Sequence, residues 1–246
     1  SKLRKMYNLY ERADIISIVS DDVKDCFVDK YSNIKGLSNK IVNLKFGLAP
    51  LDALHILPSK RKDRDNICIT IGYNARRNQQ HLKIIKILES SIDLSSIKDR
   101  IKFIIPLTYP ENIEYIKEIT DLTNNSKFTY TLLTDFMKDD EVAKLRNKTD
   151  IFIQLQETDM MSGSMLEHIA AGNIVITGSW LPYSNLEKLG LVYWKIDNTE
   201  DVSDVLFELI NKFNSCNELI KNNREIVFSN YQWKKVIESW INVTLK

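Results

Sequence analysis

The segment from Glu157 to Glu167 holds the side chains whose types and spacing point most directly to chemistry. It joins an apolar run at 150–155 to an amphipathic stretch at 162–171, and it carries two carboxylates, Asp159 and Glu167. Carboxylates that flank the start of a helix can accept hydrogen bonds from the hydroxyl groups of a sugar. The alternative is that Asp159 only caps the helix and that Glu167 is solvated.

The start of the same helix is a candidate anion site. Ser162 is a residue type that caps helices, and the first backbone N–H groups of a helix have no partner within it. The N–H groups of Gly163 and Ser164 can therefore receive a phosphate, which the partial positive charge of the helix N-terminus favours. The buried face of this helix should consist of Met165, Leu166, Ile169 and Ala170, with Glu167 on the other side.

A second candidate is the loop 72–78, which follows an apolar run and precedes a helix. Gly72 opens the loop, and Arg76 and Arg77 add full charges that can bind a phosphate with two hydrogen bonds each. The loop has neither the three glycines of a dinucleotide-binding turn nor the Gly-Lys-Ser/Thr of a P-loop. The alternative is that both arginines are ordinary surface residues.

The elements that must position these side chains alternate between strands and helices. The expected strands are 13–19, 40–44, 66–71, 101–105, 127–133, 150–155, 173–177 and 191–196. The expected helices are 21–30, 77–90, 111–122, 138–147, 162–171 and 184–189, and 200–246 should hold two or three more. This rhythm predicts an α/β fold, a Rossmann-like parallel sheet with helices on both faces. Ligands of such sheets bind at the carboxyl ends of the strands, where both candidate segments should lie.

Composition narrows the class of protein. The chain has 246 residues, of which 43% are apolar and 27% charged, a mix typical of soluble globular proteins. Its 34 basic and 33 acidic residues leave a net charge of +1, which argues against a nucleic-acid partner.

No apolar run reaches the roughly 18 residues of a membrane span. We expect no signal peptide, and the three cysteines form no CxxC pair, so a cytoplasmic location is expected. The basic, partly apolar segment 2–6 leaves a peripheral contact with the inner face of a membrane open.

The stretch 158–176 resembles the donor-site helix of GT-B glycosyltransferases. The resemblance is strongest to the large retaining family 4 and its relatives in capsule and lipopolysaccharide synthesis. In the family motif an acidic residue is followed, after seven intervening residues, by a Glu, and the helix that carries this Glu ends in Ala-x-Gly. Asp159 and Glu167 have this spacing, although the first residue of the motif is usually Glu. The connection 44–48 and the final segment that starts at Tyr231 are also similar to the family.

The resemblance implies a C-terminal donor-binding domain with three parts. Residues 1–62 would be a remnant of an N-terminal domain with the inter-domain connection, and the polar stretch 57–65 is the best linker candidate. Residues 63–231 would be the nucleotide-sugar-binding, Rossmann-like domain. Residues 232–246 would form a C-terminal helix that crosses back.

The resemblance also implies roles for site residues. Glu167 would hold the ribose hydroxyls of the nucleotide and Asp159 the hydroxyls of the donor sugar. Arg76 and Arg77 would offset the charge of the leaving diphosphate in place of a metal, so we expect no metal and no cofactor besides the nucleotide-sugar substrate. The remaining nucleotide contacts would come from Gly72, Asn78, Ser162, Gly163 and Ser164. The chain departs from the family at Tyr73 and Asn78, where the family has Arg and Lys.

The expected function is transfer of a hexosyl group from a nucleotide sugar to a saccharide or lipid-linked acceptor in bacterial surface polysaccharide synthesis. Retention of anomeric configuration is implied by the family alone. One alternative is a non-catalytic GT-B-like subunit that stabilises a partner transferase, which Tyr73 and Asn78 favour. Another is a Rossmann-like epimerase or dehydrogenase, against which the missing glycine pattern counts. The base, the sugar, the acceptor and the oligomeric state stay open, with 134–136 as a candidate contact for the base.

Overall fold

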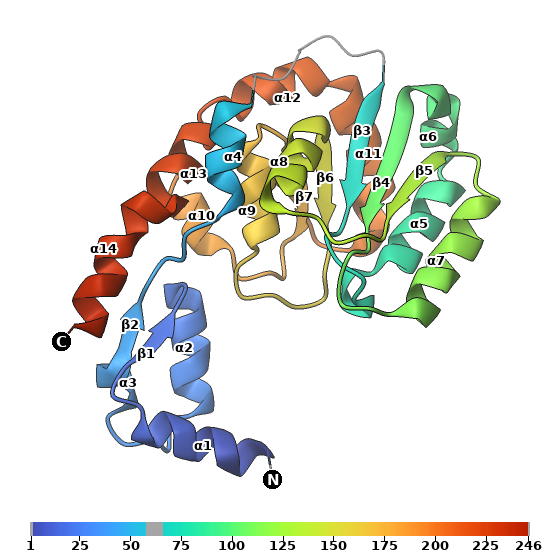
Figure 1. Cartoon of the computed structure of the whole chain (residues 1–246). Coiled ribbons are helices and arrows are strands. Elements are labelled where there is room, and N and C mark those ends of the chain that lie inside the picture. The colour runs from blue at the N-terminus through green and yellow to red at the C-terminus, as the bar shows by residue number, and fades with distance from the viewer. Residues whose placement is uncertain (1, 58–65, 246) are drawn as a thin grey trace.

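The computed structural model describes residues 2–57 and 66–245 (Figure 1). The N-terminal end contains a small parallel sheet with its own apolar cluster, which includes Ile18, Tyr31 and Leu37. Its strands are β1 (Ile16–Ile18) and β2 (Ile41–Asn43), and its helices are α1 (Lys2–Arg12), α2 (Asp21–Lys30) and α3 (Leu37–Lys40).

A six-stranded sheet forms the centre of the larger part, with the strand order β5-β4-β3-β6-β7-β8 and every pair parallel. The strands are β3 (Ile67–Ile71), β4 (Ile101–Pro106), β5 (Thr129–Leu133), β6 (Ile151–Gln154), β7 (Ile174–Gly178) and β8 (Trp194–Ile196). The chain runs outward from β3 to β5, returns to β6 on the other side of β3, and continues to β8. The order therefore reverses between β3 and β6, the point at which ligands of such sheets bind.

Alternate side chains of the central strands enter two separate cores. Ile151 and Ile153 lie in the core that α5, α7 and α11 cover, whereas Phe152 lies in the core under α4, α8, α9 and α13. The helices are α4 (Pro50–Ile56), α5 (His81–Ser90), α6 (Ile92–Ser96), α7 (Ile113–Asn124), α8 (Asp139–Lys148), α9 (Gly163–Ala170), α10 (Ser184–Lys188), α11 (Val202–Asn211), α12 (Phe213–Leu219), α13 (Asn223–Tyr231) and α14 (Trp233–Thr244). The predicted α/β fold, a parallel sheet with helices on both faces, is confirmed.

Several elements differ from the prediction. The helices α3, α4 and α6 were not expected, and the described residues 200–245 contain four α-helices rather than two or three. The predicted helix 77–90 is interrupted, because Gln80 adopts a left-handed conformation with φ of 59°. A short 3-10 turn, Arg77–Gln79, precedes that residue, and α5 begins only at His81.

The connection at residues 44–49 lies against the C-terminal helix. The indole Nε1 of Trp240 donates a hydrogen bond to the carbonyl of Lys45 at 2.8 Å, and the backbone N–H of Leu48 donates to the carbonyl of Tyr231 at 2.9 Å. The ring of Trp233 lies directly over Gly47, where a Cβ atom would overlap it. These contacts join α13 and α14 to the connection.

Helix α4 packs with the larger part of the chain. Leu51 and Leu54 are buried in the core beneath α8 and α9. The predicted linker at 57–65 lies, from Pro58 onward, outside the described residues, and so does the predicted boundary at residue 62. None of the described helices combines the length and the apolar character that a crossing of the bilayer requires.

Candidate functional site

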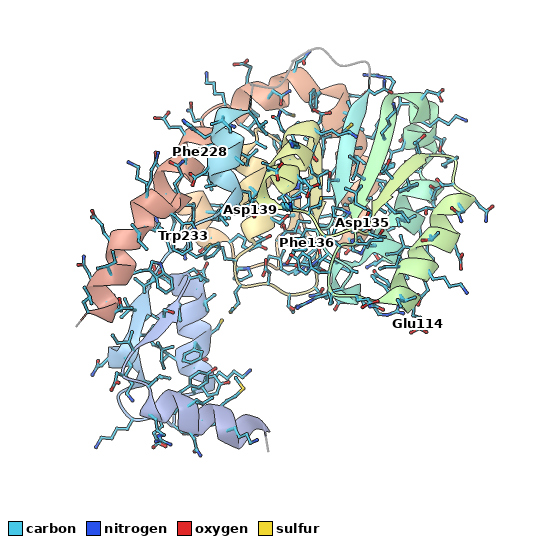
Figure 2. All side chains as sticks on the ribbon, viewed as in Figure 1. Glu114, Asp135, Phe136, Asp139, Phe228 and Trp233 are labelled. Atoms are coloured by element: carbon cyan, nitrogen blue, oxygen red, sulfur yellow. The ribbon has the colours of Figure 1, made fainter. Side chains whose placement is uncertain are left out.

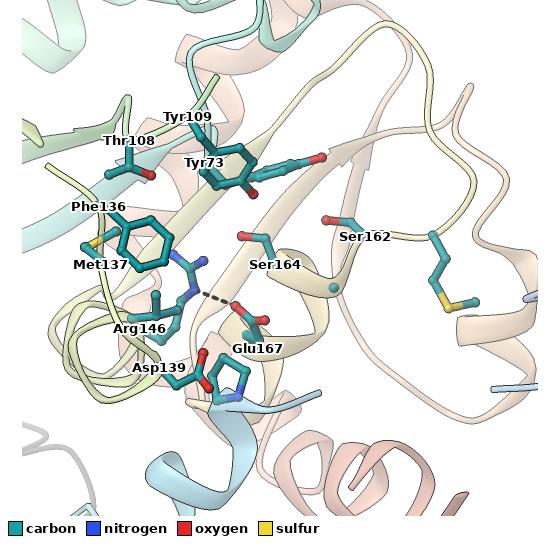
Figure 3. Close-up of a pocket in the computed structure, with 14 residues that line it drawn as sticks. Tyr73, Thr108, Tyr109, Phe136, Met137, Asp139, Arg146, Ser162, Ser164 and Glu167 are labelled. Atoms are coloured by element: carbon teal, nitrogen blue, oxygen red, sulfur yellow. Dashed lines mark hydrogen bonds and ion pairs between the residues drawn. The ribbon is translucent and has the colours of Figure 1, made fainter. Parts of the chain in front are cut away.

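Two adjoining cavities lie at the carboxyl edge of the sheet, and the side chain of Tyr73 contributes to both. The first, which we call the Glu167 cavity, has a volume of about 350 Å³. The second, the Asp159 cavity, has a volume of about 290 Å³. The loops that follow β3, β4, β5 and β6 all reach the Glu167 cavity, whose wall includes Thr108, Tyr109, Phe136, Met137, Arg146, Ser162, Gly163, Ser164 and Glu167 (Figure 3).

Glu167 is buried in the wall of its cavity and paired with a cation. It is only 8% exposed, and its Oε2 accepts a hydrogen bond from Nε of Arg146 at 3.1 Å (Figure 3). Burial raises the pKa of the Glu167 carboxyl, and the positive charge of Arg146 acts in the opposite direction. The alternative that Glu167 is solvated is therefore wrong.

Arg146 was not predicted as a site residue, because it lies in the last turn of α8, 21 residues before Glu167. Two of the five donor hydrogens of a guanidinium lie on Nη1, and in the described part of the chain the Nη1 atom of Arg146 is buried without a hydrogen-bond partner. One feature of the sequence could have indicated that Arg146 is a site residue. Arg146 lies one helical turn after Ala143, on the face of α8 that also carries Val142 and, in the first turn, Asp139, which lines the same cavity.

The start of α9 has the geometry that the sequence predicted. The hydroxyl of Ser162 accepts a hydrogen bond from the backbone N–H of Met165 at 3.1 Å, so Ser162 is the helix cap. Gly163 and Ser164 line the Glu167 cavity beside it. Because a Cβ atom on Gly163 would lie 3.1 Å from Cδ2 of Leu48, the connection approaches this helix start closely. The four apolar residues predicted for the inner face of α9 are fully buried.

Asp159 lies in the second cavity and does not cap the helix. Its Oδ2 accepts a hydrogen bond from the hydroxyl of Tyr183 at 2.5 Å, and its Oδ1 accepts one from the backbone N–H of Met160 at 2.8 Å. The loop after β3 supplies the facing wall, where Arg76 is exposed and its backbone N–H donates to Oδ1 of Asn74 at 2.9 Å. Asn78 lines the same cavity.

Gly72 and Arg77 do not occur among the described residues that line either cavity. Gly72 has a φ of 63°, and a Cβ atom there would overlap the imidazole of His81, so its role is to let the chain turn out of β3. Arg77 lies on the ring of Tyr115, 4.7 Å from the centroid, and its Nη1 donates to Glu118 at 3.1 Å. The 3-10 turn that begins at Arg77 directs this side chain toward α7 and away from Asp159.

A hydrogen-bonded group holds Tyr73 between the cavities. The Oε1 atom of Gln156 accepts hydrogen bonds from the hydroxyl of Tyr73 at 3.2 Å and from Nε2 of Gln79 at 2.5 Å. The indole of Trp180 donates to the carbonyl of Gln156 at 2.9 Å. Burial is the main reason that the pKa of the Tyr73 hydroxyl is raised, so this hydroxyl stays protonated as a donor.

Phe136 is the most exposed aromatic side chain of the Glu167 cavity. It is 78% exposed, although it lies in the cavity wall on the loop after β5 (Figures 2 and 3). A flat apolar ring in a cavity wall offers a stacking surface to another ring. It belongs to the segment 134–136 that the sequence indicated as a candidate contact for the base.

Searches with protein-family models and among curated proteins found no match. Solved structures do match. A glycosyltransferase from Rickettsia africae superposes with a TM-score of 0.73 at 14% identity, over 97% of this chain and 66% of that one. WaaG, a glycosyltransferase involved in lipopolysaccharide biosynthesis, superposes with a TM-score of 0.70 at 14% sequence identity, over 97% of this chain and 67% of that one. Anabaena HepE, solved with UDP and glucose, superposes with a TM-score of 0.71 at 13% sequence identity, over 99% of this chain and 66% of that one.

These neighbours are GT-B glycosyltransferases, and the predicted resemblance is confirmed at the level of the fold. The chain spans about two thirds of the length of these three solved structures and 46% of a fourth, TarM.

Proposed function

We propose that this chain binds a nucleotide sugar at the carboxyl edge of its sheet and acts in glycosyl transfer. The observation that carries the proposal is the placement of Glu167, the start of α9 and Asp159 around two adjoining cavities. A nucleotide sugar has a nucleoside, a diphosphate and a sugar in this linear order. The Glu167 cavity, the helix start and the Asp159 cavity offer a matching contact for each in the same order.

The nucleoside would occupy the Glu167 cavity. An ionised carboxylate accepts hydrogen bonds from both hydroxyls of a ribose, and Arg146 would hold Glu167 in its ionised form at that place. Phe136 would stack on the base. In support, the solved HepE structure holds UDP and glucose, and that of pneumococcal GtfA holds UDP and GlcNAc.

The diphosphate would lie at the start of α9, where the N–H groups of Gly163 and Ser164 and the guanidinium of Arg76 can meet its charge. In the reaction, the bond between the anomeric carbon and the diphosphate oxygen breaks, and the electron pair stays on the diphosphate. The acceptor hydroxyl forms the new bond to the anomeric carbon and loses its proton. Positive groups fixed at the leaving diphosphate stabilise this charge as it develops.

The finer proposal is transfer of a hexosyl group with retention and without a metal, to a saccharide or lipid-linked acceptor of bacterial surface polysaccharide. It is supported by the family 4 spacing of Asp159 and Glu167 and by the fold match to WaaG. A cytoplasmic location, with peripheral contact at the inner face of a membrane, belongs to the same proposal.

One observation favours a second function, that of a non-catalytic subunit that stabilises a partner transferase. Arg77 pairs with Glu118 instead of facing the Asp159 cavity, and within the described part of the chain Arg76 is the only basic residue in the wall of that cavity. A catalytic donor site with so little positive charge would stabilise the leaving diphosphate less.

Calorimetric titration of the chain with UDP, GDP, CDP, dTDP and NAD tests the proposal. We expect one nucleoside diphosphate to bind and Glu167→Gln to weaken it about tenfold or more. Arg77→Gln is the matched control, since its side chain lies outside both cavities, and should leave the affinity unchanged. Binding of none of the five would favour the partner-subunit function, and binding of NAD alone would favour a dehydrogenase or epimerase.

A further inference from the structure

A continuous chain of hydrogen bonds leads from the first turn of α9 to Asp159. The backbone N–H of Met165 donates to Oγ of Ser162, and this hydroxyl donates to Oε1 of Gln154 at 2.9 Å. Nε2 of Gln154 then donates to the hydroxyl of Tyr183 at 2.7 Å, and that hydroxyl donates to Oδ2 of Asp159 at 2.5 Å. Nε2 of Gln154 also donates directly to Oδ2 of Asp159, at a longer distance of 3.5 Å.

The direction of the chain is set at its last bond. A carboxylate can only accept, so the Tyr183 hydroxyl donates to Asp159 and must accept from Gln154. This places the amide nitrogen of Gln154 toward Tyr183 and its carbonyl oxygen toward Ser162. The Ser162 hydroxyl, which accepts from the backbone N–H of Met165, donates to that oxygen.

Tyr183 is buried, and it contacts Asp159 from the protein interior and not from the cavity. It is 3% exposed and does not line the Asp159 cavity, and Gln154 is fully buried. The carbonyl of Tyr183 accepts a hydrogen bond from the hydroxyl of Tyr193 at 3.1 Å, which ties this residue to β8 and the segment before it. Burial and the negative charge of Asp159 raise the pKa of the Tyr183 hydroxyl, so it remains a donor at neutral pH.

From this arrangement we infer that Tyr183 is a positioning residue, which fixes the Asp159 carboxylate relative to the start of α9 for contact with the sugar of the donor. The inference rests on the proposed function, because it assigns the helix start to the diphosphate and Asp159 to the sugar. The chain of hydrogen bonds then sets the spacing between these two contacts. Loss of the Tyr183 hydroxyl leaves Oδ2 of Asp159 with only the longer bond from Gln154, while Met160 still holds Oδ1. The carboxylate should therefore be held less firmly, whereas the nucleoside contacts at Glu167 should remain.

The experiment compares two ligands for each protein variant. One is the nucleoside diphosphate that binds best in the panel above, and the other is its glucose ester, such as UDP-glucose for UDP. Tyr183→Phe removes only the hydroxyl, and we expect it to weaken the glucose ester about tenfold while the nucleoside diphosphate binds within about twofold of wild type. Tyr130→Phe is the matched control, because the Tyr130 hydroxyl donates to Glu89 near the edge strand β5. It should change neither affinity.

A double-mutant cycle separates positioning from a general structural effect. If Tyr183 acts through Asp159, Tyr183→Phe combined with Asp159→Asn should weaken the glucose ester no more than Asp159→Asn alone. Independent losses that add in the double variant would overturn the inference, and so would equal weakening of both ligands by Tyr183→Phe.

The same measurements distinguish failure of the inference from failure of the proposed function. In one outcome, wild type binds the glucose ester and Asp159→Asn weakens this binding, but Tyr183→Phe leaves it unchanged. Only the positioning role of Tyr183 is then wrong. If Asp159→Asn also has no effect, or if no nucleoside diphosphate binds to wild type, the proposed function fails and the inference falls with it.

Discussion

Arg146 and Glu167 form a buried ion pair, 3.1 Å from Nε to Oε2, in which the two side chains are only 6% and 10% exposed. Two charges removed from water in this way are costly for folding unless each neutralises the other. The pair lies in the wall of the Glu167 cavity, where one carboxylate oxygen is bound to Arg146 and a ligand can use the other. We interpret the pair as the means by which the fold keeps an ionised acceptor inside a cavity.

Removal of either partner of this pair should destabilise the protein strongly. Glu167→Leu or Arg146→Met alone leaves a buried charge without a partner, and each should lower the free energy of unfolding by about 3 kcal/mol. The double variant should recover most of that loss. Urea unfolding measures all three, and Lys144→Ala is the control, because its pair with Asp140 is on the exposed side of α8. Additive losses in the double variant would contradict the account of the pair.

Nucleotide affinity should fall at acidic pH. The proposed contact with ribose needs ionised Glu167, and burial holds the pKa of this carboxyl above the ordinary value of 4.5. As the pH falls through that raised pKa the carboxylate takes up a proton, so the loss of affinity should be centred above pH 4.5. Titrations across this range should show the loss in wild type, whereas Glu167→Gln should bind weakly with no such dependence. A wild-type affinity that stays constant from neutral pH down to pH 4.5 would exclude Glu167 as the acceptor.

The stability of the fold should also fall in acid because of His81. This imidazole is fully buried at the start of α5, and burial lowers its pKa from 6.5 to about 4. Between these pH values the unfolded chain binds a proton that the folded chain does not. Stability should therefore decrease by about 3 kcal/mol from pH 6.5 to pH 4.

Chemical unfolding at a series of pH values checks this expectation. His81→Gln should remove that part of the pH dependence, whatever its effect on stability at neutral pH. The exposed His55 provides the control, and His55→Gln should retain the wild-type profile. If His81→Gln keeps the wild-type dependence of stability on pH, His81 is not the cause of the loss of stability in acid.

Phe136 should matter for nucleotide binding and hardly for folding. Because it is 78% exposed, Phe136→Ala removes little buried surface and should change stability by less than about 0.5 kcal/mol. Loss of a stacking surface for the base should nevertheless weaken the nucleoside diphosphate about tenfold. Ile113→Ala is a suitable comparison, since Ile113 is 71% exposed on α7 and lines neither cavity in the described structure. Equal affinities for the two variants would show that Phe136 does not contact the base.

Much of the fold could be predicted from local patterns. Strands β3, β6 and β7 are mostly apolar runs that are buried on both faces, and β4 is interrupted only by the exposed Lys102, so each run could be recognised without its neighbours. The cap of α9 is equally local, since Ser162 and the N–H of Met165 are three residues apart. The short helices α3, α4 and α6 were missed, since a few residues carry too little periodicity to identify a helix.

The parts of the site that depend on distant contacts could not be predicted. Arg146 joins Glu167 from another helix, and Tyr183 reaches Asp159 from a loop 24 residues further along the chain. Arg77 is the opposite case. Its charge and its place after a strand favoured a phosphate contact, but its side chain lies on Tyr115 and donates to Glu118, both in α7.

The structure of the chain bound to the nucleoside diphosphate of highest affinity would test the central claim most directly. We predict that the ribose hydroxyls lie within hydrogen-bond distance of Glu167, that the base lies on Phe136, and that the diphosphate lies at the N–H groups of Gly163 and Ser164. A nucleotide found away from the carboxyl edge of the sheet, or bound there without contact to Glu167, would contradict the proposed donor site.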